Sequence, residues 1–167
     1  MAEAEILFAE HQQGVFRYLC RIVGQAETAR DLTQEVFLRV TRSAVPAADA
    51  AGRRAWVFKI ARNLALNHLR DRRPEAGVVE LTDSRDSAEP AVQELAAAIR
   101  QALAALGDLD RDVFLLREDA GLSYDEIGAT CDLSIEGVRA RLKRARQQLR
   151  ASLDGPLQVH RNRPVRI

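Results

Sequence analysis

Apolar residues recur every three to four positions along most of this chain, a spacing typical of helices with one buried face. The pattern predicts helices over residues 4–22, 28–41, 53–70 and 91–106, another from Asp110 to just before Gly121, and two more within Leu122–Leu149. Two glycines affect these boundaries: the first helix is either continuous or kinked near Gly14, and Gly107 ends the helix over 91–106. No segment alternates apolar and polar residues with the period of a strand, so we expect an all-α protein.

The helical pattern stops between residues 74 and 90, where the composition becomes acidic and rich in Pro, Gly, Ser and Asp. Such a stretch is typical of a linker that is extended or lacks fixed structure. We therefore expect two small helical domains joined by an acidic linker. The expected boundaries are a first domain over 1–73, the linker over 74–90, a second domain over 91–154 and a basic tail over 155–167. Gly155 and Pro156 are expected to break the last helix and leave the tail frayed.

The segment Leu122–Leu149 has the pattern of two helices joined by a tight turn, which predicts a helix-turn-helix in the C-terminal domain. Ser123 and Glu126 have the spacing of a capping box for the first helix, and Ser134 can cap the second. The apolar residues of the second helix, at helical spacing, are Val138, Leu142, Ala145 and Leu149. Its other faces carry basic residues with no acid beyond Glu136: Arg139, Arg141, Lys143, Arg144, Arg146 and Arg150.

A helix-turn-helix places its second helix in the major groove of DNA. Positive charge on that helix neutralises phosphates, and long side chains with several donors reach the base edges. The alternative is a solvated basic face on an ordinary bundle helix, which a run of charge alone would favour. The combination of a capped helix, a short turn and a purely basic second helix favours DNA binding.

Basic and amide side chains also follow one face of the helix predicted over 53–70. They are Arg53 and Arg54 at its start and Lys59, Arg62, Asn63, Asn67 and Arg70 along its length. Such a face suits a phosphate backbone and unpaired bases. The apolar face of the same helix consists of Trp56, Val57, Ile60, Ala61 and Leu64. The single tryptophan, Trp56, is therefore expected in the core.

The helix predicted over 28–41 has a polar face opposite its core stripe of Leu32, Val36, Phe37 and Val40. Asp31, Gln34, Glu35 and Leu38 share this face at helical spacing, and Arg39 lies beside it. The face is either plainly solvated or a docking surface for a basic partner. Composition alone favours solvation.

The net charge of the whole chain is only +1, so any nucleic-acid surface must arise from segregated charge. Cys20 and Cys131 lie far apart without metal-ligand spacing, so we expect buried free thiols in a reducing cytoplasm and no metal site. No apolar run has transmembrane length, and the N-terminus lacks a signal pattern. The sequence also has no glycine-rich phosphate loop and no recognisable catalytic set, so we expect neither a cofactor nor an enzymatic activity.

Several segments resemble, in their order, the bacterial extracytoplasmic-function sigma factors: Asp31–Val40, Ala55–Arg70, Leu122–Gly128 and Gly137–Arg146. The resemblance extends over about Ala4–Leu153. It implies a transcription initiation factor with two domains, called region two and region four, and with no chemistry of its own. It also implies two partners, core RNA polymerase and promoter DNA, and a third, since the family is commonly held inactive by an anti-sigma factor.

The resemblance further implies a role for each surface. In this family the Asp-x-x-Gln-Glu helix docks on the clamp helices of the polymerase β′ subunit, and region four meets the β flap. Against the preference from composition, polymerase binding is thus expected at Asp31, Gln34, Glu35, Leu38 and Arg39. Recognition of the minus-ten promoter element is expected at Arg53, Arg54, Trp56, Lys59, Arg62, Asn63, Asn67 and Arg70. Recognition of the minus-thirty-five element is expected at Ser134, Arg139, Arg141, Lys143, Arg144 and Arg146.

Within the last set, Arg139, Lys143 and Arg144 are the best candidates for contacts at or near base edges. Arg141 and Arg146 contact either phosphate or the core of the protein, and sequence does not decide between the two.

One departure from the family pattern lies before Trp56. Family members often have a polar, aromatic-containing segment there that helps to hold the flipped base of the minus-ten element, whereas this chain has the alanine-rich Val45–Arg54. Two alternatives to a sigma factor are a stand-alone helix-turn-helix regulator and a sigma mimic that binds an anti-sigma factor. The face at Asp31–Arg39 argues against the first, and the two intact basic faces argue against the second.

Overall fold

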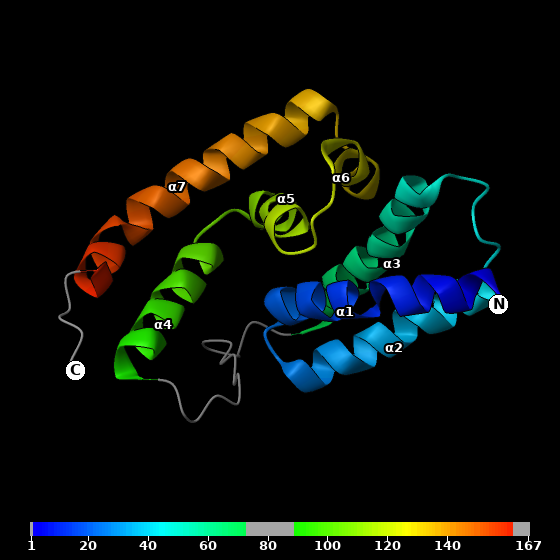
Figure 1. Cartoon of the computed structure of the whole chain (residues 1–167), viewed down its shortest axis with the longest axis horizontal. Coiled ribbons are helices and arrows are strands. Elements are labelled where there is room, and N and C mark those ends of the chain that lie inside the picture. Colours follow the sequence, from blue (N-terminus) through cyan, green and yellow to red (C-terminus); the bar gives the residue numbers. More distant parts are fainter. Residues whose placement is uncertain (1, 73–88, 162–167) are drawn as a thin grey trace.

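The computed structural model describes residues 2–72 and 89–161. Every regular element within these residues is a helix (Figure 1). In chain order they are α1 (Glu3–Val23), α2 (Ala26–Arg42), α3 (Ala50–Asp71), α4 (Pro90–Ala104), α5 (Asp108–Glu118), α6 (Tyr124–Cys131) and α7 (Ile135–Arg161). The prediction of an all-α fold is confirmed. The predicted linker lies outside the described residues except at its end, where Pro90 begins α4, a position that suits the fixed φ of proline.

Helices α1, α2 and α3 pack against one another around an apolar core. Gly14 lies inside α1, which runs without interruption from Glu3 to Val23. The reason is the apolar stripe of α1, since Leu7 before the glycine and Val15 and Leu19 after it are all buried in the same core. This burial outweighs the cost of roughly 1 kcal/mol that a glycine has in a helix interior.

Helix α3 begins at Ala50 and not at Arg53, where the pattern placed its start. The Asp49 side chain caps the helix by accepting a hydrogen bond of 2.8 Å from the backbone N–H of Gly52. The predicted start lies too far along the chain because the alanines of the first turn add nothing to the apolar periodicity. The buried residues of α3 are Ala55, Val57, Phe58, Ala61, Leu64 and Ala65.

Helices α4 to α7 form a second bundle, in which α5 packs on α6 and α7, and α4 lies along α7 (Figure 1). The expectation that Gly107 ends the preceding helix was wrong, because α4 stops at Ala104 and Gly107 directly precedes α5. Helix α5 therefore begins at Asp108 and includes Asp110 in its first turn. Acidic side chains in a first turn are stabilised by the helix dipole, which favours this earlier start.

Helix α7 continues through Gly155 and Pro156 to Arg161, so the predicted break at these residues was wrong. A proline inside a helix removes one backbone hydrogen bond and is usually disruptive. Here the end of α7 lies along α4, and Leu153 packs on the apolar cluster that contains Ala102 and Leu149. Packing against α4 just before the proline supports the helix across it. Residues 155–161 are thus helical, and the rest of the predicted tail lies outside the described residues.

The two bundles pack directly on each other, mainly through α3 and α6 and to a smaller extent through α1 and α5 (Figure 1). One apolar cluster spans both bundles, with Tyr18 and Phe58 on the N-terminal side and Val113, Leu116 and Ile127 on the C-terminal side. The Thr130 hydroxyl also donates a hydrogen bond of 3.2 Å to the Ala55 carbonyl across the boundary. Sequence patterns did not predict this arrangement.

The turn after α6 folds back on Gly128 and leaves no room for a side chain. A Cβ atom added to Gly128 would lie 2.7 Å from the backbone oxygen of Leu133. We predict that Gly128→Ala lowers the free energy of unfolding by about 1–3 kcal/mol, because this backbone must shift to relieve the overlap. Urea denaturation of the full-length chain measures the change.

Gly14→Ala is the matched control, since it makes the same substitution in another helix interior. There the new Cβ atom would meet the Phe58 ring at 3.5 Å, an ordinary contact. Helix propensity should then stabilise the protein by up to about 1 kcal/mol. Stabilisation of similar size in both variants would show that the close approach at Gly128 is absent.

Candidate nucleic-acid interface

The helix-turn-helix is built by two side-chain caps and one left-handed residue. Ser123 caps α6 by accepting a hydrogen bond of 3.2 Å from the Glu126 N–H, while the Glu126 carboxylate accepts one of 2.6 Å from the Ser123 N–H. Asp132 ends α6 with φ of 56°, a conformation that Asp tolerates better than most residues. The Ser134 hydroxyl then accepts a hydrogen bond of 3.1 Å from the Gly137 N–H at the start of α7. The predicted capping box and second cap are both confirmed.

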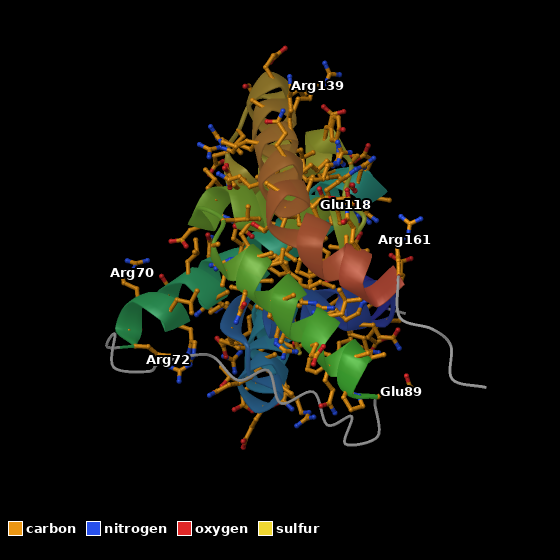
Figure 2. All side chains as sticks on the ribbon, turned by 90° about the vertical axis from the view of Figure 1, so that its left-hand side faces the viewer. Arg70, Arg72, Glu89, Glu118, Arg139 and Arg161 are labelled. Atoms are coloured by element: carbon orange, nitrogen blue, oxygen red, sulfur yellow. The ribbon has the colours of Figure 1, made fainter. Side chains whose placement is uncertain are left out.

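The first half of α7 presents its basic face to solvent. Arg139 and Lys143 are exposed, and neither forms an ion pair with another described residue. The Arg139 guanidinium lies over the Tyr124 ring, 5.9 Å from its centroid, and Arg117 lies on the same ring at 5.0 Å. Figure 2 shows Arg139 at the tip of the molecule, at the opposite end of α7 from Arg161. These two cations can therefore reach a ligand without breaking an ion pair.

Three other basic residues of α7 are held by acids of α5. Asp110 accepts hydrogen bonds from Arg141 at 2.8 Å and from Arg144 at 2.7 and 3.1 Å. Arg146 donates one of 2.7 Å to Glu118. The structure thus separates the six residues predicted for the minus-thirty-five element. Arg139 and Lys143 face solvent, Ser134 is a cap, and Arg141, Arg144 and Arg146 connect α7 to α5.

The Asp110 side chain is buried, and hydrogen bonds from Arg141 and Arg144 stabilise its negative charge. The hydrogen bonds from Arg144 lower the pKa of its carboxyl group, and although burial acts in the opposite direction, Arg141 adds to the lowering. The charged form of Asp110 therefore stabilises the fold.

Two of the predicted minus-ten residues on α3, Arg54 and Lys59, face the C-terminal bundle. Arg54 donates hydrogen bonds of 2.9 and 2.6 Å to the Glu126 carboxylate and a third of 2.8 Å to the Gly121 carbonyl. Lys59 lies 3.1 Å from a carboxylate oxygen of Asp132. Burial alone would raise the pKa of Glu126, but hydrogen bonds from Arg54 and Ser123 outweigh it and hold that pKa below its ordinary value. Arg54 and Lys59 are therefore both engaged within the protein.

Arg62 belongs to a buried polar network between the two bundles. Its guanidinium and the Tyr18 hydroxyl both donate hydrogen bonds to the Asp112 carboxylate. Burial raises the pKa of Asp112, and the bonds from Tyr18 and Arg62 offset this effect only in part. Both donors come from the N-terminal bundle, whereas Asp112 lies on α5. The network therefore joins α1, α3 and α5 at one buried point.

The remaining minus-ten residues lie elsewhere on α3. Asn63, Asn67 and Arg70 are exposed along its second half, where the Asn67 side chain accepts a hydrogen bond of 2.8 Å from Arg70. Arg53 lies 3.1 Å from Glu3 of α1. Trp56 is half-buried and packs on the core, as expected of a tryptophan on the apolar face. The basic residues of α3 up to Arg62 are thus engaged within the protein, whereas Asn63, Asn67 and Arg70 beyond it are open to solvent.

The polar face of α2 is open to solvent. Asp31, Gln34 and Arg39 are exposed, and Glu35 is half-exposed and accepts a hydrogen bond of 2.9 Å from Arg39 one turn later. Leu38 is 46% exposed in the middle of this polar face. A single exposed leucine is common on protein surfaces, so this face remains accessible to a partner without itself identifying one.

Sequence reasoning missed the acids that meet the basic helices. Asp110, Asp112 and Asp132 were not predicted to pair with basic residues, and Glu126 was predicted only as part of a capping box. Asp110 and Asp112 immediately precede the apolar run of α5, which is the one local signal they carry. Their partners come from other helices, so no local pattern could identify them.

The described residues 2–72 and 89–161 contain no group of three or more His, Cys, Asp and Glu side chains that could hold a metal ion. Within the same residues, no helix is both long enough and apolar enough to cross a membrane.

Comparisons with known proteins agree with this architecture. Residues 7–75 match the family described as Sigma-70 region 2, and residues 96–149 match Sigma-70, region 4. The chain is 37% identical over 153 residues to the ECF RNA polymerase sigma factor SigE of Mycolicibacterium smegmatis, covering 86% of this chain and 59% of that protein. It is 32% identical over 154 residues to the ECF RNA polymerase sigma factor SigL of Mycobacterium tuberculosis, covering 88% of this chain and 86% of that protein.

A solved structure has the same fold. The sigma factor RpoE from Bartonella quintana, in complex with the anti-sigma factor NepR, superposes with a TM-score of 0.72 at 20% identity, over 92% of this chain and 98% of that chain. The two helical bundles and the helix-turn-helix thus define an initiation-factor fold. The chain belongs to the sigma-70 family of RNA polymerase sigma factors, as a member of the extracytoplasmic-function type, which confirms the resemblance seen in the sequence.

The lowered pKa of Asp110 predicts an acid-dependent loss of stability. A carboxyl group whose pKa is lower in the folded state stabilises the fold above its unfolded pKa of about 3.9, and this stabilisation is lost as pH falls further. Asp110→Asn should lower the free energy of unfolding at neutral pH by about 1–3 kcal/mol, because two arginines lose a charged acceptor. The difference from the wild type should shrink between about pH 5 and pH 3.

Urea denaturation at several pH values measures this difference. Asp154→Asn is the control, because it makes the same substitution at an exposed residue of α7. Its stability should follow the wild type at every pH. A constant gap between wild type and Asp110→Asn down to pH ~3 would contradict the role given to Asp110.

Proposed function

We propose that this chain binds core RNA polymerase, recognises the minus-thirty-five and minus-ten promoter elements and directs the initiation of transcription. The observation that carries the proposal is the exposed tip of α7, where Arg139 and Lys143 extend from a capped helix-turn-helix and form no ion pair with described residues. A helix placed in this way can enter a major groove with its cations directed at phosphates and base edges. We propose that the chain acts in the cytoplasm and carries out no catalytic step of its own.

Three surfaces have separate roles in this proposal: the polar face of α2, the basic face of α3 and the exposed tip of α7. Region two, over residues 1–73, would bind polymerase through the polar face of α2 and hold the minus-ten element on α3. Region four, over residues 91–154, would read the minus-thirty-five element with α7, with residues 74–90 as a linker and 155–167 as a tail. Arg139 and Lys143 would meet DNA first. Arg141, Arg144 and Arg146 would mainly fix α7 on α5, since each is in an ion pair there.

An anti-sigma factor is the third partner that we propose. The structure of RpoE, which shares this fold, contains the anti-sigma factor NepR. In the present chain, exposed apolar side chains such as Phe8 and Leu38 lie on region two and are available to such a partner.

Run-off transcription tests the proposed function. Purified full-length chain is added to bacterial core RNA polymerase on a pool of genomic promoter fragments. Transcripts that appear only when the chain is present would support the proposal and identify both promoter elements. Absence of transcripts, together with absence of a complex with core polymerase on a sizing column, would favour a stand-alone regulator.

Arg139→Ala and, separately, Lys143→Ala should weaken use of the minus-thirty-five element. A good contact to a base edge contributes about 1–3 kcal/mol, so the amount of transcript at limiting chain concentration should fall by about 5-fold to 150-fold. Arg161→Ala removes the same kind of side chain from the opposite end of α7 and should leave transcription unchanged (Figure 2). Affinity for core polymerase should be the same in all three variants, and a parallel loss of core binding would contradict the assignment.

Gln34→Ala combined with Glu35→Ala should weaken binding to core polymerase by tenfold or more, about 1.4 kcal/mol, because the pair lies at the centre of the polar face of α2. A matched control is available, since Gln93 and Glu94 are a neighbouring pair of the same two residues, exposed on α4. The double alanine variant at these positions should bind core polymerase as the wild type does. Unchanged affinity after the α2 substitutions would make that face merely solvated.

A further inference from the structure

Two arginines from different helices lie over the ring of Tyr124, the first residue of α6. The guanidinium of Arg117, on α5, lies 5.0 Å from the ring centroid, and that of Arg139, on α7, lies 5.9 Å from it. Both distances are within the range of roughly 6 Å in which the face of an aromatic ring attracts a cation. One ring thus contacts a cation from each of the helices that precede and follow α6.

The ring of Tyr124 is itself held in place. Tyr124 is half-buried, packs on the apolar cluster shared by the two bundles and directly follows the cap at Ser123. Arg117 donates a hydrogen bond of 2.9 Å to the Leu122 carbonyl, which connects α5 to the segment that leads into α6. The ring is therefore a fixed support for a side chain that rests on it.

Arg139 differs in this respect from the other basic residues of α7. Acids of α5 hold three of them in ion pairs. Lys143 and Arg150 are exposed and have neither an ion pair nor a ring contact with another described residue. Arg139 is also exposed and without an ion pair, but it has the ring of Tyr124 beside it. It is therefore restrained and still available to a ligand.

The contact lies beside a basic groove on the surface of α7. A hollow of about 270 Å³ is lined by Tyr124 and by four cations that follow one another at helical spacing, Arg139, Lys143, Arg146 and Arg150. None of the described residues that line this hollow is acidic. The groove therefore favours an anionic partner such as a nucleic-acid strand.

We infer that Tyr124 is a positioning residue, whose ring holds the Arg139 guanidinium ready to read a base edge of the minus-thirty-five element. The inference rests on the proposed function, because it takes α7 as the helix that enters the major groove. It adds a residue outside α7 that determines specificity by acting through Arg139.

The physical reason is the conformational entropy of arginine. An exposed arginine side chain samples many rotamers, and a contact of two donors with a base edge fixes it in one of them. A ring that already restricts the guanidinium in the free chain removes part of this cost. A guanidinium that stacks on a ring also keeps its N–H donors free, whereas an ion pair with a carboxylate occupies them. The ring contact therefore suits a side chain that must bind a base.

The ring and the hydroxyl group of Tyr124 have separate contacts. The pKa of Arg146 is raised first by its hydrogen bond to Glu118 and further by one to the Tyr124 hydroxyl. Tyr124→Phe removes only the hydroxyl group and keeps the ring beside Arg139. Tyr124→Leu removes the ring as well but keeps an apolar side chain on the core. The two variants therefore distinguish the effect of the ring from that of the hydroxyl group.

The first measurement needs neither DNA nor polymerase. Heteronuclear NOE values of the arginine Nε–Hε groups are recorded by NMR on the isotopically labelled full-length chain, and the Arg139 signal is assigned by its loss in Arg139→Ala. Arg150 is the matched reference, because it is an exposed arginine of the same helix without a ring contact. We expect Arg139 to be more rigid than Arg150 in the wild type and in Tyr124→Phe, and as mobile as Arg150 in Tyr124→Leu. Equal mobility of the two arginines in the wild type would overturn the inference.

The second measurement is run-off transcription by the chain assembled with core polymerase, on a promoter identified from the genomic pool. Base pairs of its minus-thirty-five element are replaced one at a time, and the position read by Arg139 is the one at which replacement has no effect in Arg139→Ala. We expect Tyr124→Leu to lower the ratio of transcript from the original promoter to transcript from the promoter replaced at this position by about twofold to fivefold. Tyr124→Phe should leave the ratio unchanged. The absence of any such position would overturn the inference.

Two backgrounds show whether Tyr124 acts through Arg139. At limiting chain concentration, adding Tyr124→Leu to Lys143→Ala should still lower the amount of transcript by about twofold to fivefold, whereas adding it to Arg139→Ala should change nothing further. Lys143 is the matched control, as an exposed cation of the same groove without a ring contact. A loss of similar size in both backgrounds would indicate a general effect on the fold and would overturn the inference.

The two measurements separate this inference from the proposed function. If no transcripts appear, the proposed function is contradicted, and NMR still reports whether the ring restrains Arg139. If transcripts appear and Tyr124→Leu leaves the ratio unchanged, the inference alone is overturned. Circular dichroism compares the helix content of all variants. If Tyr124→Leu is unfolded, Tyr124→Met replaces it, since methionine adapts to irregular packing.

Discussion

A buried carboxylate is stable only where a cation or several donors meet it, and Asp112 finds both across the boundary between the two bundles. Tyr18 of α1 and Arg62 of α3 donate to this one side chain of α5. If the bundles separate, the same three groups exchange these bonds for water. The relative placement of the bundles thus depends on a polar network whose three side chains satisfy one another only while the two bundles are in contact. Apolar packing between α3 and α6 adds affinity to this arrangement.

Helix α3 consequently packs in the core of region two and also contacts region four. Its apolar stripe belongs to the core of region two, whereas Arg54 and Arg62 connect it to region four. Glu126 has a similar double use, since it caps α6 through Ser123 and also accepts from Arg54. The cap that shapes the helix-turn-helix is thereby coupled to the position of α3. The polar face of α2 and the tip of α7 lie outside this connection, and these are the surfaces that a polymerase and a duplex can reach first.

The sequence predicted what local periodicity determines, namely the helices, the capping box at Ser123 and Glu126, the cap at Ser134 and the open face of α2. It did not predict contacts between distant residues: Arg62 and Asp112 are 50 positions apart and Arg54 and Glu126 are 72 apart, and no local pattern connects them. Tertiary packing also overrode a local rule in the last helix, because α7 continues through Pro156 along α4. The same limit explains why Arg144 was grouped with Arg139 and Lys143 as a base-edge candidate, although it forms an ion pair with Asp110 of α5.

The most direct test of the contact between the two bundles is small-angle X-ray scattering from the free full-length chain at ~0.1 M salt, where exposed charges are screened but buried pairs persist. The account predicts a scattering curve that the arrangement of Figure 1 fits, and a larger radius of gyration when Glu126 and Asp132 are neutralised. A wild-type curve that only two separated bundles can fit, with no change on neutralisation, would contradict it.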